Sequence, residues 1–214
     1  SRPSYPQELV DWLKNQLHLN PTSQVIDLGA GTGKFLAYLQ QVTPHITAIE
    51  PIAEMLAQLK ISYPHIETRQ ACSNDLPVTA NSIDAVVCAQ SFHWFANFET
   101  LQQIHQVLKP EGHLALIWNQ RDIQVDWVKA LADLLQPLES NTPRYHSGQW
   151  QVVFEHQSLF EWVNVHTFTQ HHVGTVENVV SKRLLSTSFI AAMPEQQQQL
   201  LKQQFEHIVL QYTG

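Results

Sequence analysis

The sequence predicts an α/β fold that is doubly wound around a mostly parallel sheet. Two observations predict it. Between residues 24 and 119, short apolar runs alternate with segments of helical spacing, and a chain that alternates in this way builds a parallel sheet covered by helices on both faces. The first apolar run also ends in a glycine-rich turn, residues 29–33, that leads into a helix. Ligands of such sheets bind beyond the carboxyl ends of the strands.

The individual elements follow from local patterns. Apolar residues at helical spacing predict a first helix over residues 6–17. Asn97 is expected to cap the helix at 97–108, and Pro110 and Gly112 are expected to end that helix and turn the chain into the next strand. The expected strands cover residues 24–28, 45–50, 66–71, 83–89 and 113–119, and the expected helices between them cover residues 33–41, 52–62 and 97–108.

The pattern changes after Trp118. We expect helices over residues 126–138, 176–191 and 195–212, a turn-rich stretch over 141–151 and a strand over 159–169. No repeat and no linker interrupts the chain. The prediction is therefore a single domain over residues 1–214, with a core at about 20–120 and a helical cap at about 121–214.

The glycine-rich turn reads Val25-Ile26-Asp27-Leu28-Gly29-Ala30-Gly31-Thr32-Gly33-Lys34-Phe35. A phosphate-binding loop needs a glycine five residues before Gly33 and a serine or threonine after the lysine, and neither is present. A dinucleotide loop needs a third glycine where Lys34 stands. Glycines leave the backbone open to a ligand, and the following helix offers unpaired N–H groups. The turn therefore suits an adenosine-type cofactor with a charged tail.

A carboxylate follows the second expected strand. Glu50 ends the run Ile46-Thr47-Ala48-Ile49 and is placed to accept hydrogen bonds from both hydroxyls of a ribose. Dinucleotide enzymes use the same geometry, so Glu50 alone does not discriminate between the two cofactor classes.

Four stretches together resemble one family. The Gly-x-Gly-x-Gly turn, "LKPEG" at 108–112, "AQSFHWF" at 89–95 and "SRPSYP" at 1–6 resemble class I S-adenosylmethionine-dependent methyltransferases, in particular the methyltransferase type 11, trans-aconitate methyltransferase-like branch. The resemblance implies a Rossmann-like sheet of the seven-stranded type. A final antiparallel strand, which usually closes this sheet, is not found before Gly214, so we expect the native protein to continue.

The resemblance also implies a cofactor and its binding residues. S-adenosyl-L-methionine is the expected cofactor and S-adenosyl-L-homocysteine the expected product. Backbone atoms of Gly29, Ala30 and Gly31 would face the amino acid tail, and Asp27 would orient the loop or the ammonium group. The remaining expected cofactor contacts are Glu50, Pro51, Ile52, Ser73, Asn74, Gln90, Arg2 and Tyr5. Many relatives carry an aspartate where Cys72 stands, so Asn74 is expected to take over the contact to the adenine.

His93 is the candidate catalytic residue, either as a general base or as a group that orients an acidic substrate. The expected substrate pocket contains aromatic and cationic side chains: Phe92, Trp94, Trp118, Arg121, Arg144 and Tyr145. The aromatic residues fit a protein core equally well. The resemblance implies a small-molecule acceptor that is methylated on oxygen, with a carboxylate as one candidate. A carboxylate would need no base.

The composition limits which partners the protein is expected to bind. The formal net charge is −7 and no basic cluster is present, which argues against nucleic acid. No apolar run is long enough to cross a bilayer. Cys72 and Cys88 are expected to be buried reduced thiols of a cytoplasmic protein. The twelve histidines show no metal-ligand spacing, so no metal is predicted. The oligomeric state is unknown.

Two other functions stay open at this point. The chain can be a nicotinamide-dinucleotide oxidoreductase, although Lys34 and the "LKPEG" turn count against that function. It can also bind S-adenosylmethionine without catalysing a reaction, because no residue here is an obligatory nucleophile.

Overall fold

The computed structural model describes residues 4–139 and 142–213. Two compact units divide the chain. Residues 6–118 and 143–168 form a sheet-containing unit, and the other described residues form a helical unit. Residues 143–168, which the sequence analysis assigns to the cap, therefore belong to the unit that contains the sheet.

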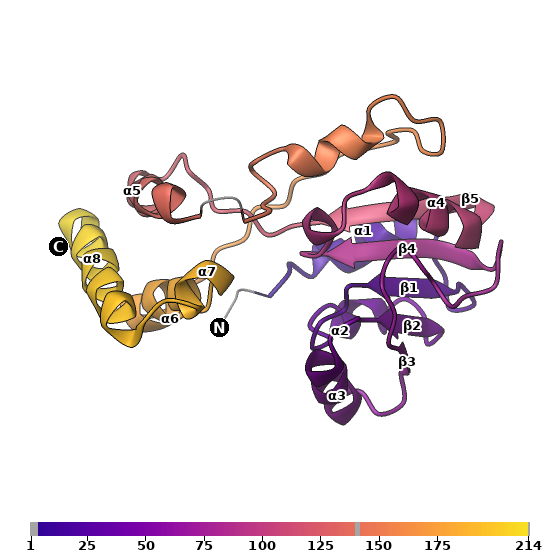
Figure 1. Cartoon of the computed structure of the whole chain (residues 1–214), viewed down its shortest axis with the longest axis horizontal. Coiled ribbons are helices and arrows are strands. Elements are labelled where there is room, and N and C mark those ends of the chain that lie inside the picture. The colour runs from indigo at the N-terminus through magenta and orange to yellow at the C-terminus, as the bar shows by residue number, and fades with distance from the viewer. Residues whose placement is uncertain (1–3, 140–141, 214) are drawn as a thin grey trace. The chain divides into compact units, whose positions relative to one another are not determined.

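The sheet of the first unit confirms the predicted α/β class. Its five described strands are all parallel and lie in the order β3-β2-β1-β4-β5 (Figure 1). Strand order reverses at β1, since β2 lies on one side of it and β4 on the other. Such a reversal opens a crevice at the carboxyl ends of the strands. The strands are β1 (Val25–Leu28), β2 (Ile46–Ile49), β3 (Glu67–Arg69), β4 (Ile83–Ala89) and β5 (Leu108–Ile117).

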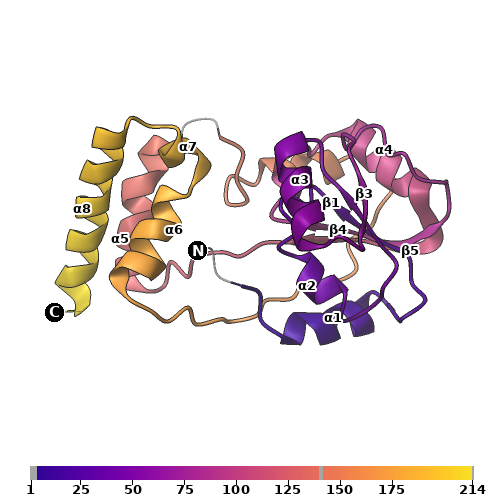
Figure 2. The same cartoon turned by 90° about the horizontal axis from the view of Figure 1, so that it is seen from below.

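Helices cover both faces of this sheet. Figure 2 shows α1 and α2 on one side of the strands and α4 on the other. Side chains alternate between the faces along a strand, so Asp27 points to the face opposite Ile26 and Leu28. Ile26 and Leu28 pack with Leu101 and Ile104 of α4. The helices of this unit are α1 (Glu8–Gln16), α2 (Leu36–Leu39), α3 (Ala53–Ser62) and α4 (Phe98–Val107), with 3₁₀ helices η1 (Phe92–Trp94) and η3 (Gln149–Phe154).

The predicted helix cap is confirmed and two predicted boundaries are corrected. Asn97 accepts a hydrogen bond from the Thr100 backbone N–H at 2.8 Å. The expected helix over 33–41 is α-helical only at Leu36–Leu39. Hydrogen bonds over three residues form tighter turns on either side of it, from Leu36 N–H to Gly33 O and from Gln41 N–H to Tyr38 O. The expected turn at 109–112 is an irregularity inside β5, where the pairing shifts between Ile83 and Ala85 of β4.

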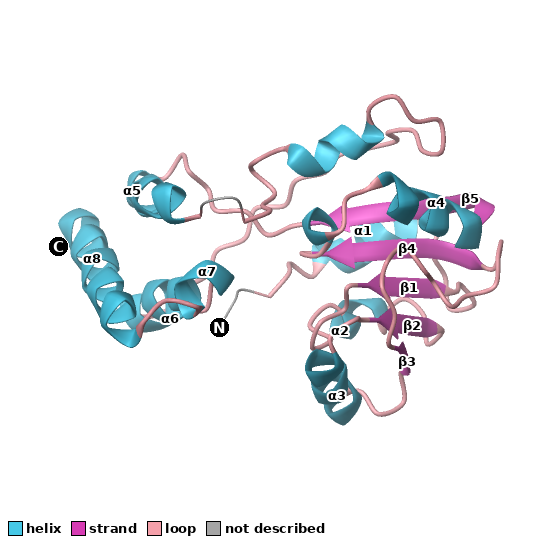
Figure 3. Cartoon of the chain, in the orientation of Figure 1, coloured by secondary structure: helices cyan, strands magenta, loops and turns pink. Residues whose placement is uncertain are grey.

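The expected strand at 159–169 is wrong. Residues 161–173 have no regular secondary structure (Figure 3). The backbone at the start of this segment bonds to a side chain instead of a neighbouring strand: the Gln157 amide oxygen accepts from Leu159 and Phe160 N–H, and its nitrogen donates to the Phe160 carbonyl. Alternating apolar residues were therefore not sufficient to make a strand.

The helical unit contains the three helical regions that the sequence predicts. In Figure 2, α5, α6 and α8 lie side by side, and they enclose a core that includes Leu135, Leu184 and Phe205. The elements are α5 (Asp126–Leu135), η2 (Gln136–Leu138), the π-helical turn η4 (Glu177–Ser181), α6 (Lys182–Leu185), α7 (Ser188–Ala191) and α8 (Glu195–Thr213). Within the described residues, none of the helices has the length and apolar character that crossing a membrane requires.

Candidate functional site

The candidate cofactor site lies where β1, β2 and β4 end. Because these strands are parallel, their carboxyl ends meet at one edge of the sheet. The glycine loop follows β1, Glu50 follows β2 and Gln90 follows β4. Three segments that are distant in the sequence therefore converge on one place.

The physical reason for a glycine differs among the three positions of the loop. All three have positive φ, which favours glycine. A Cβ on Gly29 would lie 2.6 Å from Ser91 Cβ, and one on Gly33 would lie 3.0 Å from both Leu36 Cδ1 and Leu59 Cγ. A Cβ on Gly31 would meet only Met55 Sδ, at 4.0 Å. Gly29 and Gly33 thus permit close packing, whereas Gly31 leaves open space over the backbone.

Hydrogen bonds tie the glycine loop to β2. The backbone N–H groups of Gly29 and Ala30 both donate to the Ile49 carbonyl, at 2.9 and 3.1 Å. The Glu50 carboxylate accepts from Gly31 N–H at 2.8 Å and from Ile52 N–H at 3.0 Å. Glu50 is buried, and the exposed Pro51 and Ile52 follow it at the surface. The loop and the acid at the end of β2 therefore form one preorganised structure.

Asp27 is a second carboxylate below this loop. It is almost fully buried, and its Oδ2 atom has no hydrogen-bond partner. Burial, with a smaller contribution from the negative charge of Glu50, raises the pKa of Asp27 to about 7. A buried carboxyl group without a full set of partners is costly. A cationic ligand group or an ordered water that reached this atom would relieve the cost.

The end of β4 closes the site from the other side of β1. Gln90 has a left-handed backbone with φ of 61°, and its N–H donates to the Ile117 carbonyl at 2.8 Å. The Ser91 hydroxyl donates to the Leu28 carbonyl at 2.7 Å. Sequence reasoning missed Ser91, and its only signal is the small side chain that the close approach of Gly29 requires.

The loop after β3 gives one correction. Ser73 shares a hydrogen bond of 2.8 Å with Thr100 of α4, and Asn74 is exposed. Cys72 is also exposed, so the prediction that both cysteines are buried is wrong for Cys72 and confirmed for Cys88. The reason is that Cys72 follows β3 in a turn, whereas Cys88 lies inside β4, which is flanked by β1 and β5. Both thiols are free.

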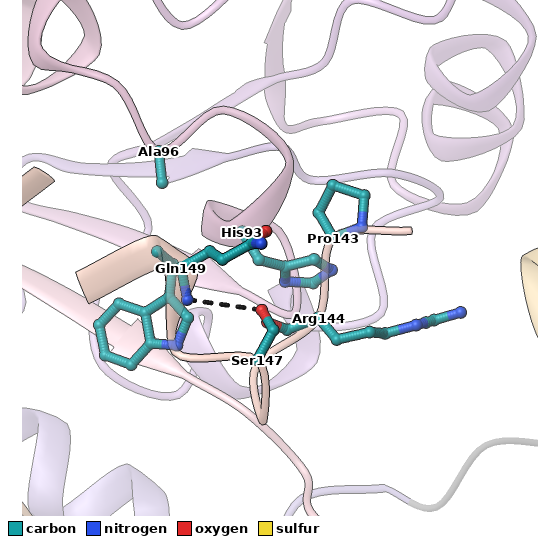
Figure 4. A pocket seen from close by; sticks show the side chains of 7 residues that line it. His93, Ala96, Pro143, Arg144, Ser147 and Gln149 are labelled. Carbon is teal, nitrogen blue, oxygen red and sulfur yellow. Dashed lines mark hydrogen bonds between the residues drawn. The ribbon is translucent and has the colours of Figure 1, made fainter. Parts of the chain in front are cut away.

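A pocket lies next to η1, within the sheet-containing unit. Figure 4 shows His93, Pro143 and Arg144 in its wall. Its volume is about 140 Å³, close to that of an engineered cavity that holds benzene, at about 150 Å³. The pocket therefore has room for the reacting group of a small molecule. The lining residues are His93, Ala96, Pro143, Arg144, Ser147, Gln149 and Trp150.

Aromatic rings pack against this pocket. Trp118 lies with its ring centroid 4.6 Å from that of Trp150 and 5.0 Å from that of Tyr145. Trp118 Nε1 donates to His93 Nδ1 at 3.1 Å. Phe92 is fully buried in the core, and Trp94 is half exposed. Trp150 falls in the stretch 141–151, which the sequence predicts only to be rich in turns. It lines the pocket because η3 packs on η1.

The structure does not describe three of the predicted site residues within the sheet-containing unit. Arg2 lies outside the described residues. Tyr5 and Arg121 belong to the helical unit. Among the described residues, no group of histidine, cysteine, aspartate and glutamate side chains is arranged to hold a metal ion.

Comparison with known proteins gives the family. Residues 26–116 match the family described as "Methyltransferase domain". A methyltransferase-like protein of Schizosaccharomyces pombe is 34% identical over 97% of this chain and 81% of its own length. The chain belongs to the class I methyltransferases. It is a methyltransferase that depends on S-adenosyl-L-methionine.

Further relatives agree with this membership. A methyltransferase of Mycobacterium tuberculosis is 33% identical over 76% of this chain and 70% of its own length. Among solved structures, that of a putative type II methyltransferase from Anaeromyxobacter dehalogenans has a TM-score of 0.57 at 21% identity, over 78% of this chain and 70% of that one. That likeness concerns the fold. The trans-aconitate methyltransferase-like branch stays a prediction.

Because the chain is a methyltransferase, it is not a nicotinamide-dinucleotide oxidoreductase. The residues present fit S-adenosylmethionine. Gly31 leaves the backbone open, as close approach of a ligand requires. The unpartnered Asp27 oxygen suits an ammonium group, and Glu50 lies beside the loop as an acceptor for hydroxyl groups.

Proposed function

We propose that this methyltransferase transfers the methyl group of S-adenosylmethionine to a carboxylate oxygen of a small acid. The observation that carries the proposal is the pocket lined by both His93 and Arg144. Arginine holds planar carboxylates through two parallel hydrogen bonds. His93 follows β4, as do Gln90 and Ser91 of the candidate cofactor site.

The cofactor would bind across the ends of β1, β2 and β4. The N–H-rich backbone of Gly29, Ala30 and Gly31 would receive the amino acid tail, with Asp27 near its ammonium group. Glu50 would bind the ribose. Pro51, Ile52, Ser73 and Asn74 would surround the adenine, and Gln90 would reach the tail. The predicted contributions of Arg2 and Tyr5 remain part of this proposal.

Methyl transfer to a carboxylate does not require a general base. A carboxylate is already a nucleophile at neutral pH, so the pocket needs only to remove water and align the acceptor oxygen with the sulfonium methyl. A volume of about 140 Å³ accommodates the acid group and a few further atoms. Trp118 and Tyr145 would then contact the acceptor's apolar part.

The proposal includes the partner and the location. The acceptor is a small molecule and not nucleic acid, in keeping with the net charge of −7. The two free thiols, Cys72 and Cys88, fit the reducing cytoplasm.

Methyl transfer to paired acceptors tests this function. The full chain is incubated with methyl-labelled S-adenosylmethionine and with small carboxylic acids, each beside its primary amide and a phenol of similar size. We expect labelled product from the acids alone, and release of labelled methanol from it by mild base, as for an ester. Label that enters only phenols or amides, or that resists base, would overturn the carboxylate proposal.

A variant pair links activity to the pocket. Arg144→Gln removes the cation, and we expect KM for the acid to rise about tenfold or more while the affinity for S-adenosylhomocysteine stays unchanged. The matched control is Arg183→Gln in α6, outside the pocket. An unchanged KM in Arg144→Gln would remove this arginine from the site.

A further inference from the structure

The hydrogen bond between Trp118 and His93 determines where the histidine carries its proton. Trp118 directly follows β5, and His93 lies in η1. An indole N–H can only donate, so His93 Nδ1 must accept the bond of 3.1 Å. A neutral imidazole has one donor and one acceptor nitrogen. The proton of His93 therefore lies on Nε2, at the side of the ring away from Trp118.

The aromatic neighbours of Trp118 hold its indole in this orientation. Its ring packs against Trp150 and Tyr145. Trp150 is buried, and its own N–H donates to the Tyr145 carbonyl at 3.0 Å. Rotation of Trp118 away from His93 would disrupt two ring contacts. The bond to His93 is thus supported by packing and does not depend on a single flexible side chain.

We propose that Trp118 is a positioning residue that fixes the Nε2–H tautomer of His93, so that His93 donates a hydrogen bond to the acceptor and does not act as a base. This inference rests on the proposed carboxylate function. A general base at this place would need an unprotonated Nε2 and a proton on Nδ1. The Trp118 N–H would then face another N–H, an arrangement without an acceptor.

A donor at this position suits transfer to a carboxylate. A lone pair of one carboxylate oxygen forms the new O–CH₃ bond, while the electron pair of the breaking C–S bond stays on sulfur. The sulfonium becomes a neutral thioether, the carboxylate becomes a neutral ester, and no proton moves. His93 Nε2–H would bond to the oxygen that does not attack. Arg144, which lines the same pocket, would share the carboxylate's charge.

Nitrogen-15 NMR of the His93 ring tests the tautomer without any assay of activity. At a pH where His93 is neutral, we expect the wild-type protein to show the Nε2–H pattern alone. Trp118→Phe keeps an aromatic ring but removes the donor, and we expect it to show both tautomers in exchange. The matched control is Trp162→Phe, because Trp162 packs on Trp150 and is half exposed. An Nδ1–H pattern in the wild type, or an unchanged pattern in Trp118→Phe, would overturn the inference.

Steady-state kinetics test whether His93 acts as a hydrogen-bond donor or as a general base. In Trp118→Phe we expect KM for the acid to rise about fivefold to tenfold, with little change in kcat or in the affinity for S-adenosylhomocysteine. His93→Gln places an amide N–H near the Nε2 position and should keep kcat within about tenfold of the wild type. A fall in kcat of about 10²–10⁴ in His93→Gln, the size expected for loss of a general base, would contradict the donor role. If no acid is methylated at all, the proposed function fails, and the NMR comparison still decides the tautomer.

Discussion

The carboxylate of Glu50 accepts a hydrogen bond from the backbone N–H of Gly31 at 2.8 Å. This bond joins the end of β2 to the middle of the glycine loop after β1, and the second carboxylate oxygen accepts from Ile52 N–H at 3.0 Å. One buried side chain therefore shapes the loop and also lies where a ribose is expected. Binding and local stability should respond together when Glu50 is changed.

Glu50→Gln should weaken both properties. The amide has one acceptor oxygen, so one of the two backbone donors would face its NH₂ group. We expect a loss of about 1–3 kcal/mol in the free energy of unfolding. The affinity for S-adenosylhomocysteine, measured by titration calorimetry, should fall roughly tenfold to a hundredfold, because hydrogen bonds to a charged group contribute about 1.5–3 kcal/mol. The control is Glu54→Gln in α3, an exposed acid, and equal affinities of the two variants would argue against the ribose contact.

Two glycine substitutions should separate binding from folding. Gly31→Ala has space for its methyl group, so we expect only about 1 kcal/mol of destabilisation from its positive φ. Its cofactor affinity should nevertheless fall at least tenfold. Gly29→Ala would place a methyl group against Ser91 and should lower stability by about 2 kcal/mol or more. Thermal unfolding and calorimetry on both variants check this, and normal cofactor affinity in Gly31→Ala would show that no ligand approaches there.

Asp27 should make stability fall as pH rises. Its folded-state pKa is about 7, raised from 3.8 mainly by burial and partly by Glu50. Between these values the folded protein holds a proton that the unfolded chain has lost, so the free energy of unfolding decreases from about pH 4 to about pH 7 and then levels off. The contribution is of the order of 4 kcal/mol. Asp27→Asn should flatten this part of the profile, as followed by denaturant unfolding, and an identical slope in both proteins would contradict the raised pKa.

The same carboxyl group predicts a proton linked to binding. If the cofactor's ammonium approaches ionised Asp27, binding at pH 6 should release a proton from the protein. Calorimetric titrations with S-adenosylhomocysteine in buffers of different ionisation enthalpy measure this release. Asp27→Asn should lose it and bind more weakly. Proton uptake by the wild type would place the ammonium elsewhere.

The cap of α4 provides a stability test outside the candidate site. Asn97→Ala removes the acceptor for Thr100 N–H and should cost about 0.5–2 kcal/mol. Asn97→Asp keeps an acceptor and should stay close to the wild type. Denaturant unfolding of the three proteins checks the order, and equal stability of the alanine variant would show that the cap is dispensable.

The sequence by itself determined the features that depend on neighbouring residues. Alternating apolar segments predicted the parallel sheet, because hydrophobic periodicity is a local pattern. The glycine turn, the acid at Glu50 and the cap at Asn97 were predicted from adjacent residues, and the structure brings the first two together. The same local reasoning predicted a strand at 159–169 that is absent, since a strand also needs a partner elsewhere in the chain.

Only the tertiary structure decided what depends on contacts between distant segments. The burial of Asp27 beside Glu50, the approach of Ser91 to Gly29 and the hydrogen bond from Trp118 to His93 join residues that are from 23 to 62 positions apart. A pKa, a tautomer and the fit of a glycine are set by packing geometry and by exclusion of water. None of these three properties is encoded in any short stretch of the sequence.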